Sequence, residues 1–123
     1  MNILLIEDDE QIADLVVSAF DVAGVKTQVE KDGFRGLRTA LQLNFDAILL
    51  DVALPLMDGF QVLEGLKANN ANDYVPVLVI TAQPGHKVRA LQAGAKDFVS
   101  KPFDLVEVKT RIHNLVEVRL LYQ

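Results

Sequence analysis

The sequence predicts an α/β fold, a doubly wound parallel sheet of five strands. Short apolar runs alternate with segments of helical periodicity along the 123-residue chain, and this alternation repeats five times. Strands that alternate with helices form a parallel sheet covered by helices on both faces. Half of the residues are hydrophobic, which is enough to bury a core in a single domain of this length.

Four of the predicted strands are apolar runs bounded by acids, Pro, Gly or Ser, as is usual for buried strands. These strands are residues 3–6, 47–50, 77–80 and 98–99. The remaining strand, residues 26–30, is more polar. We therefore expect it to lie nearer an edge of the sheet.

Apolar residues at spacings of three and four predict a helix after each strand. The stripes are Ile12, Leu15, Val16, Ala19 and Phe20; Phe34, Leu37 and Leu41; Phe60, Leu63 and Leu66; Val88 and Leu91; and Leu105, Val108, Ile112 and Leu115, a run that Arg119 continues at the same spacing. The first helix should stop at Gly24, the second near Asn44 and the short fourth at Gly94. Asp104 and Glu107 have the spacing of a capping box at the start of the fifth helix.

The composition argues against several classes of protein. With no cysteine, the chain has no disulfide, thiol catalysis or cysteine-ligated metal. A formal net charge of −5 predicts no direct binding to nucleic acid. No apolar run approaches the roughly 20 residues of a membrane helix, and the first residues do not form a targeting signal. We expect a single domain, residues 1–123, in the cytoplasm and without a membrane partner.

Polar residues follow directly after the central predicted strands. Parallel strands bring their carboxyl ends to one edge of the sheet, where ligands of doubly wound folds bind. The residues at this edge are Glu7, Asp8 and Asp9 after the first strand, Asp51 after the third, Thr81 after the fourth, and Ser100, Lys101 and Pro102 after the fifth. The sequence therefore predicts a cluster of carboxylates with a hydroxyl and an ammonium group.

The three consecutive acids allow two interpretations. A solvated acidic turn would use one of them to cap the following helix. A cap needs only one carboxylate, however, and carboxylates gathered opposite Asp51 repel one another unless a cation lies between them. Oxygen ligands without a soft ligand favour Mg²⁺, or Mn²⁺, over zinc. Metal binding is therefore the preferred hypothesis.

Taken alone, Asp51, Thr81 and Lys101 would be interpreted as a strand-end acid, a core hydroxyl and a surface lysine. Together at one edge they indicate phosphoryl transfer. A carboxylate can attack phosphorus and form an acyl phosphate. A cation, a lysine and a hydroxyl can then stabilise the charge on the transferring group.

Four segments resemble the receiver domains of two-component signalling, and the resemblance covers the whole chain. The segments are Ile-Leu-Leu-Ile-Glu-Asp-Asp-Glu, Leu-Leu-Asp-Val-Ala-Leu-Pro-Leu-Met-Asp-Gly-Phe, Val-Ile-Thr-Ala and Ala-Gly-Ala-Lys-Asp-Phe-Val-Ser-Lys-Pro-Phe. The resemblance implies a flavodoxin-like (βα)5 fold with strand order 2-1-3-4-5. It also implies a phosphoacceptor switch rather than a turnover enzyme.

The resemblance assigns the metal ligands. Glu7 and Asp8 would form the acidic pair, with Asp8 as the direct ligand and Asp9 as a competing candidate. Asp51 would accept the phosphoryl group and also contact the metal. The backbone carbonyl of Ala53 would be a further ligand.

The resemblance also implies how the switch works. Thr81 and Lys101 would hold the phosphoryl oxygens, and Phe98 would pack inward when Thr81 moves, changing the surface of helix 4, strand 5 and helix 5. The Lys101–Pro102 bond would be cis. Residues 81–94 form a shorter stretch than is usual in the family, so helix 4 is expected to be short.

Three other functions fit the sequence less well. A dehalogenase-like phosphatase would need an acid two residues after the nucleophile, where Ala53 stands. A flavin-binding protein would need a Gly/Ser/Thr-rich phosphate loop after the first strand, where this chain has three acids. A phosphate-independent interaction domain would be expected to lack Asp51 or Lys101.

The expected phosphodonor is a sensor histidine kinase or a histidine phosphotransfer protein, and the effector or output domain is unknown. A homodimer through helix 4, strand 5 and helix 5 is a further expectation. The apolar Leu120 and Leu121 indicate that the last helix continues further or pairs with another chain. A domain excised from a longer regulator is favoured, and a stand-alone domain is the alternative. His86 and His113 are predicted to face solvent.

Overall fold

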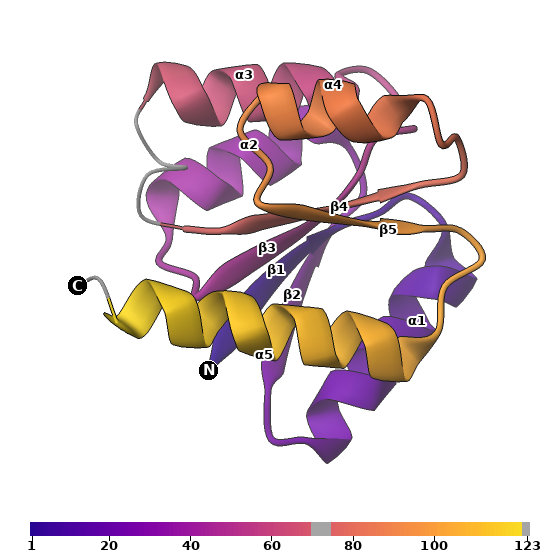
Figure 1. Ribbon diagram of the computed structural model, residues 1–123, viewed down its shortest axis with the longest axis vertical. Coiled ribbons are helices and arrows are strands. Elements are labelled where there is room, and N and C mark those ends of the chain that lie inside the picture. Colours follow the sequence, from indigo (N-terminus) through magenta and orange to yellow (C-terminus); the bar gives the residue numbers. More distant parts are fainter. Residues whose placement is uncertain (70–74, 122–123) are drawn as a thin grey trace.

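The computed structural model describes residues 1–69 and 75–121, and these residues form five strands and five helices in alternation (Figure 1). The elements are β1 (Asn2–Ile6), α1 (Glu10–Val22), β2 (Lys26–Glu30), α2 (Gly33–Gln42), β3 (Ala47–Asp51), α3 (Gly59–Ala68), β4 (Val77–Thr81), α4 (His86–Gln92), β5 (Asp97–Ser100) and α5 (Leu105–Leu121). The predicted strand–helix repeat is therefore confirmed, including the short α4.

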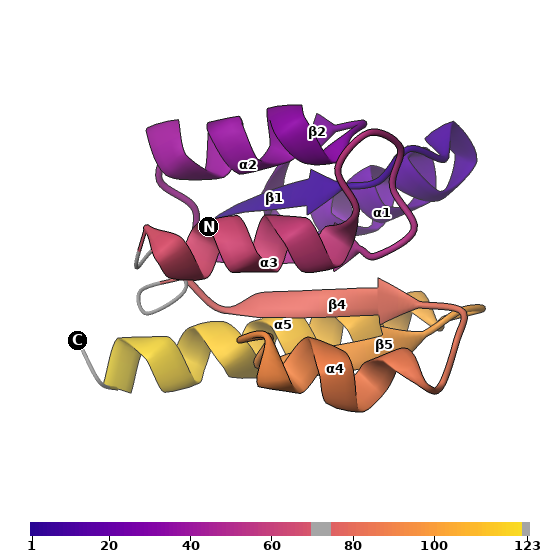
Figure 2. The ribbon, with the colours of Figure 1, turned by 90° about the horizontal axis from the view of Figure 1, so that it is seen from above.

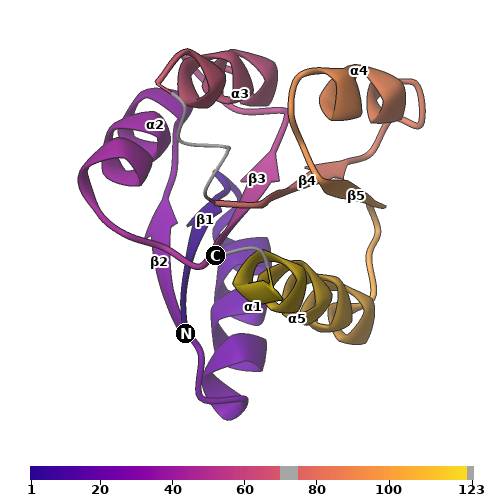
Figure 3. The same ribbon diagram turned by 60° about the vertical axis from the view of Figure 1, so that its left-hand side comes forward.

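The strands form one parallel sheet with the order β2-β1-β3-β4-β5, as predicted. Helices α2, α3 and α4 cover one face, and α1 and α5 cover the other (Figure 3). The polar strand β2 lies at an edge, and none of its residues is fully buried. Figure 2 shows that β1 and β4 point the same way, so that the loops after them lie at one edge of the sheet.

The two helical layers enclose two separate hydrophobic clusters. Strand β1 shows how one strand serves both, because successive side chains point to opposite faces. Leu4 and Ile6 belong to the cluster beneath α2, α3 and α4, whereas Ile3 and Leu5 belong to the cluster beneath α1 and α5. All four side chains are fully buried. This is why the central strands are continuous apolar runs rather than alternating ones.

Helix α2 forms where predicted, but of its apolar stripe only Leu37 packs against the core. Phe34 is 57% exposed and Leu41 is 43% exposed. The buried positions are small residues such as Gly36, where an added Cβ would lie 2.6 Å from the side chain of Ile6. The helix approaches the sheet through glycine, and this close approach turns two of the large apolar side chains outward.

The capping box predicted for α5 is only half formed. The Asp104 carboxylate accepts a hydrogen bond from the Val106 amide at 2.8 Å and therefore caps the helix. The Glu107 carboxylate instead accepts from the Arg111 Nε at 3.1 Å, one turn further along the helix. A charged partner at the (i, i+4) position competes successfully with the reciprocal backbone bond.

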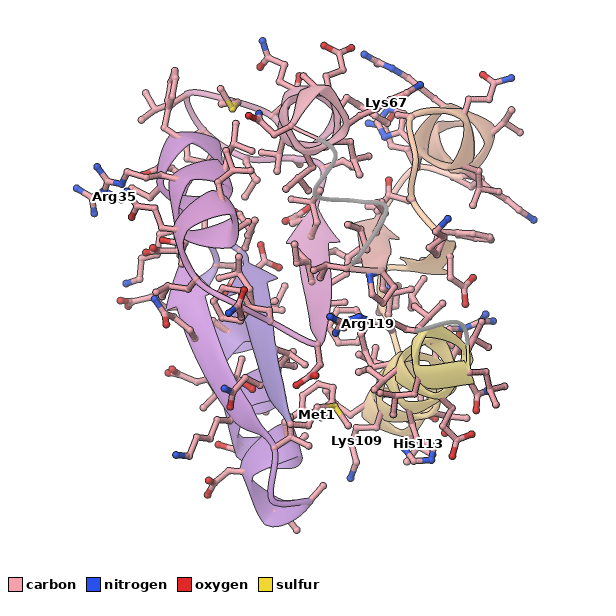
Figure 4. The ribbon with its side chains drawn as sticks, turned by 90° about the vertical axis from the view of Figure 1, so that its left-hand side faces the viewer. Met1, Arg35, Lys67, Lys109, His113 and Arg119 are labelled. Carbon is pink, nitrogen blue, oxygen red and sulfur yellow. The ribbon has the colours of Figure 1, made fainter. Side chains whose placement is uncertain are left out.

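The outer face and the far end of α5 can be followed in Figure 4. His113 faces solvent as predicted, with Nε2 3.0 Å from Glu117 Oε1. Arg119 lies on the side of α5 that faces the sheet, and its guanidinium donates to the carbonyl oxygens of Phe45 and Asp46 at 3.3 and 3.4 Å. These contacts hold the helix against the segment before β3.

Within residues 1–69 and 75–121, no helix has the length and apolar character that are needed to span a membrane.

Candidate functional site

The side chain of Asp51, the last residue of β3, is held at the centre of the sheet edge. Asp51 is 2% exposed. Its Oδ1 accepts a hydrogen bond from the Ala53 amide at 3.0 Å, and its Oδ2 accepts one from Lys101 Nζ at 2.9 Å. Because both oxygens are bonded, the carboxylate has a fixed orientation.

The turn that begins α3 lies directly against the end of β3. A Cβ at Gly59 would lie 2.5 Å from the Cα of Val52 and 2.7 Å from the backbone oxygen of Asp51. Only glycine allows this approach. Asp58 and Gln61 form a capping box here, which was not predicted from the sequence.

Glu7 and Asp8 reach the same position from the loop after β1. Carboxylate oxygens of Glu7, Asp8 and Asp51 lie within 4.8 Å of one another. Glu7 is fully buried, and its Oε1 accepts a hydrogen bond from Lys101 Nζ at 3.0 Å. Its Oε2 is buried without a hydrogen-bond partner among the described residues. Asp8 is exposed and lies on the solvent side of the cluster.

The electrostatics of the cluster reflect this burial. Desolvation, followed by the neighbouring Asp51 carboxylate, raises the pKa of Glu7 from 4.5 to about 8, although Lys101 opposes the shift. Burial lowers the pKa of the Lys101 ammonium, but Asp51 and Glu7 outweigh it and the pKa is raised. Without a cation, burial and the neighbouring carboxylate therefore favour the protonated form of Glu7.

The donor set fits a hard divalent cation. Three carboxylates converge, and one buried oxygen of Glu7 has no hydrogen-bond partner in residues 1–69 and 75–121, which is costly unless a cation or proton satisfies it. Oxygen ligands of this kind suit Mg²⁺ or Mn²⁺. Glu7, Asp8 and Asp51 are the side chains placed to hold the ion.

Asp9, the competing candidate for a ligand, has a different task. Its Oδ1 accepts hydrogen bonds from the amides of Gln11 at 2.9 Å and Ile12 at 3.2 Å. These are the bonds of a helix N-cap. Asp9 therefore caps α1, whereas Glu7 and Asp8 of the same acidic run lie in the cluster with Asp51.

Thr81, the last residue of β4, is 2% exposed, and its hydroxyl is bonded within the following loop. Oγ1 accepts a hydrogen bond from the Gln83 amide at 3.0 Å and lies 3.3 Å from the Gln83 carbonyl oxygen. It also lies 3.2 Å from His86 Nδ1. Among the described residues, these are the partners of the hydroxyl, and neither is Asp51 or Lys101.

His86 does not face solvent, contrary to the prediction. It is half-buried, and its ring packs edge-on against Phe60 with centroids 5.2 Å apart and planes at 88°. The cause is the short turn before α4, in which the His86 amide donates to the Gln83 carbonyl at 3.1 Å. The short stretch with Pro84-Gly85 is the feature of the sequence that could have indicated this position. It joins Thr81 to His86 by a tight turn, so that the two side chains lie in contact.

Phe98 of β5 is half-buried. The Nζ of Lys87 lies 4.5 Å from the centroid of its ring, within the range of a cation–π contact. Lys101 follows β5, and the Lys101–Pro102 peptide bond is cis, as the resemblance implies.

A five-stranded doubly wound sheet with an acidic pair, a central aspartate, a hydroxyl and a lysine at one edge defines the receiver class of signalling domains. The profile of the family described as "response regulator receiver domain" matches residues 3–113, and the chain belongs to this family. It is therefore a phosphoacceptor domain of signal transduction rather than a turnover enzyme.

Curated relatives are longer than this chain. It is 40% identical over 117 residues to the DNA-binding dual master transcriptional regulator RpaA of Synechocystis, covering 94% of this chain and 48% of the relative. It is 37% identical over 124 residues to the transcriptional regulatory protein QseB of Haemophilus influenzae, covering 99% of this chain and 55% of the relative. The chain thus spans about half the length of these regulators.

Solved receiver domains match over nearly their full length. A Francisella response regulator receiver domain has a TM-score of 0.88 at 30% identity, covering 94% of this chain and 96% of the other. The receiver domain of a sensor histidine kinase from Pseudomonas aeruginosa has a TM-score of 0.87 at 29% identity, covering 94% and 97%. That domain was crystallised with a magnesium ion coordinated in its active site cleft.

Proposed function

We propose that this domain accepts a phosphoryl group on Asp51 from a phosphohistidine of a sensor histidine kinase or a histidine phosphotransfer protein. The observation that carries the proposal is the 2.9 Å contact between Lys101 Nζ and Asp51 Oδ2 at a buried, acid-lined edge of the sheet. A nucleophilic carboxylate is useful for phosphoryl transfer only if positive charge stands beside it. Here a lysine already does so.

Mg²⁺, or Mn²⁺ in its place, would be held by Glu7, Asp8 and Asp51, with the backbone carbonyl of Ala53 as a further proposed ligand. When bound, the ion would neutralise charge on the phosphoryl oxygens and on the facing carboxylates. The Pseudomonas domain with magnesium in its cleft supports this assignment. Ala53 is exposed, which leaves this side of Asp51 open to a donor.

The chemical step is a displacement at phosphorus. A bond forms between an Asp51 carboxylate oxygen and phosphorus while the bond to the donor imidazole nitrogen breaks, and that nitrogen keeps the electron pair. Lys101 is placed to bind the Asp51 carboxylate before the transfer and the negatively charged phosphoryl oxygens after it. Ala53 provides no general base two residues after Asp51, so rapid hydrolysis of the acyl phosphate is not built into this side chain.

The proposed switch uses Thr81 and Phe98. The phosphoryl group adds about −1.5 to −2 charges and three acceptor oxygens, so the Thr81 hydroxyl gains a new partner near Asp51. The movement of Thr81 leaves space for Phe98, which is now half-buried, to pack inward. The surface of α4, β5 and α5 changes as a result, and the two arrangements differ in population before and after phosphorylation.

The effector is proposed to bind the surface of α4, β5 and α5, either as an output domain or as a second copy of this domain. Val88 of α4 is 60% exposed and Leu91 is 40% exposed, so apolar area is available there. Sedimentation velocity with and without a phosphodonor would show whether a dimer forms on phosphorylation. Residues 1–123 as one receiver domain of a longer regulator, and a cytoplasmic location, remain predictions.

Intact mass measurement after incubation with acetyl phosphate tests the proposal. We expect one phosphoryl adduct in the presence of Mg²⁺ and little without it. Asp51→Asn should form no adduct while keeping the fold, as judged by circular dichroism. If the wild-type protein forms no adduct under any of these conditions, the domain does not have the proposed phosphoacceptor activity.

A further inference from the structure

The first turn of α4 contacts both residues of the proposed switch. His86 Nδ1 lies 3.2 Å from the Thr81 hydroxyl, and Lys87 Nζ lies 4.5 Å from the centre of the Phe98 ring. Among the described residues, neither α4 side chain makes a hydrogen bond or ion pair with Asp51, and neither belongs to the acidic cluster. Adjacent residues of one short helix therefore hold the two side chains that must move.

The geometry points to His86 as a positioning residue that holds the Thr81 hydroxyl on the loop side, away from Asp51, until Asp51 is phosphorylated. This inference rests on the proposed function. A threonine hydroxyl has a single proton to donate. If Thr81 donates it to His86 Nδ1 or to the Gln83 carbonyl, it cannot at the same time donate to a phosphoryl oxygen.

Both tautomers of His86 have the same effect on the position of the oxygen. With an unprotonated Nδ1, the ring accepts the Thr81 proton and competes directly with the phosphoryl group. With a protonated Nδ1, the ring donates to Thr81 Oγ1, which fixes the oxygen in the loop. In either case, the hydroxyl must leave His86 before it can reach a group on Asp51.

The His86 ring is itself held in place. Phe60 of α3 is 5% exposed and supports the ring edge-to-face at 5.2 Å. The guanidinium carbon of Arg89 lies 3.8 Å from the centre of the same Phe60 ring, which packs a second residue of α4 against it. The short turn through Pro84 and Gly85 fixes where α4 begins. A supported ring can restrain Thr81, whereas a solvated one would not.

The consequence is a higher threshold for switching. A hydrogen bond made only in the unphosphorylated arrangement stabilises that arrangement, and the phosphorylated one must overcome it. Removal of one such bond changes the balance by about three- to tenfold, as expected for a typical net hydrogen bond. His86 would thus tune how readily Thr81 responds without taking part in phosphoryl transfer.

Two substitutions separate the hydrogen bond from the ring. His86→Phe keeps an aromatic ring against Phe60 but has no group to bond Thr81. His86→Asn loses the ring but places an amide near the position of Nδ1. The probe is beryllofluoride with Mg²⁺, a non-covalent mimic of an aspartyl phosphate, and the measured quantity is its Kd for each folded protein.

We expect His86→Phe to bind beryllofluoride about three- to tenfold more tightly than the wild type, and His86→Asn to stay close to the wild type. In a Thr81→Val background, His86→Phe should have no effect, because the partner hydroxyl is missing. Equal affinity of His86→Phe and wild type, or an effect that persists in Thr81→Val, would overturn the role of His86.

A measurement without any phosphate analogue distinguishes this inference from the proposed function. Three-bond NMR couplings of Thr81 should report a single χ1 rotamer in the wild type and His86→Asn, and an average of rotamers in His86→Phe. Averaging in the wild type would refute the restraint directly. A fixed rotamer in a wild-type protein that binds no beryllofluoride would refute the proposed function, and with it the switching role of His86.

Discussion

At the scale of single residues, Glu7 stands out because one oxygen of its fully buried carboxylate has no hydrogen-bond partner within the part of the chain that the structure describes. Burial and Asp51 raise the pKa of Glu7 from 4.5 to about 8. Between these values, the native metal-free protein holds a proton that the unfolded chain has lost. The free energy of unfolding therefore falls as the pH rises through this window.

The prediction is tested by comparing the wild type with Glu7→Gln in urea melts at several pH values with EDTA present. Gln mimics the protonated glutamate, so the variant should gain stability relative to the wild type as the pH rises from 4.5 toward about 8. A difference between the two proteins that does not change with pH would show that Glu7 is ionised throughout.

Leu56, in the loop between Asp51 and α3, is a second unusual residue, because its backbone conformation lowers the free energy of unfolding. It has a positive φ of 69° and is 79% exposed, so a leucine side chain is strained without being buried. Asn adopts this backbone region more easily. Leu56→Asn should raise the free energy of unfolding by about 1 kcal/mol, measured by urea denaturation.

A matched control is Leu43→Asn, because Leu43 is 51% exposed but has an ordinary φ of −117°. This variant should show little change. An equal gain in both variants would mean that removal of exposed apolar surface, rather than relief of the left-handed conformation, causes the effect.

The residues of the cluster could be predicted because strand order fixes their positions. Asp51 ends β3 and Lys101 directly follows β5. Because the carboxyl ends of parallel strands meet at one edge of the sheet, the strand order alone predicts that these two residues lie close together. The direction of the Thr81 hydroxyl and the partners of His86 could not be predicted in this way. They depend on the path of one short loop, and the periodicity of the sequence does not predict the path of a loop.

At the scale of elements, the start of α3 packs so closely against the end of β3, near Asp51, that a side chain at position 59 would clash with the backbone. Gly59→Ala would place a methyl group 2.5 Å from the Cα of Val52, which is backbone and cannot rotate away. We expect a loss of about 1–3 kcal/mol in the free energy of unfolding, measured by urea denaturation. We also expect a weaker response to Mg²⁺, because the displaced backbone carries Asp51.

Gly85→Ala is the control for this substitution. A Cβ at Gly85 meets nothing within 4 Å, and its φ of −64° suits any residue. The variant should be as stable as the wild type or slightly more stable, since alanine restricts the unfolded chain. Equal losses in both variants would indicate a general need for glycine in these turns and no special contact at Gly59.

The packing of α2 and the cap of α5 are two features of the helices that the sequence does not predict. Periodicity predicted every helix, but it could not show that α2 packs through Gly36 and leaves Phe34 exposed, because a stripe of small residues has no hydrophobic signal. Spacing predicted a capping box at Asp104, but the choice of Arg111 as the partner of Glu107 is a competition between two local bonds. Such competitions are decided by geometry.

At the scale of the whole molecule, the proposed metal site would couple ion binding to folding through the acidic cluster. An ion that binds only the native state stabilises it by about 2.7 kcal/mol at a concentration 100 times its Kd. Mg²⁺ should therefore raise the Tm of the wild type. Differential scanning calorimetry in Mg²⁺ and in EDTA measures the effect.

Asp8→Asn should lose most of this stabilisation, because it removes a carboxylate from the cluster. Glu10→Gln is the matched control, since Glu10 is an exposed acid that pairs with Lys31 at 2.6 Å and lies outside the cluster. A Tm that rises equally in all three proteins would show a general salt effect and no metal site at Asp8.

The central claim is that Asp51 carries the phosphoryl group, and the most direct test is to map the modified residue. Borohydride reduces an aspartyl phosphate to homoserine, which tandem mass spectrometry of peptides locates after treatment with acetyl phosphate and Mg²⁺. We predict homoserine at position 51, with no modification of His86 or His113. Conversion at another acid, or a phosphohistidine with position 51 unchanged, would contradict it.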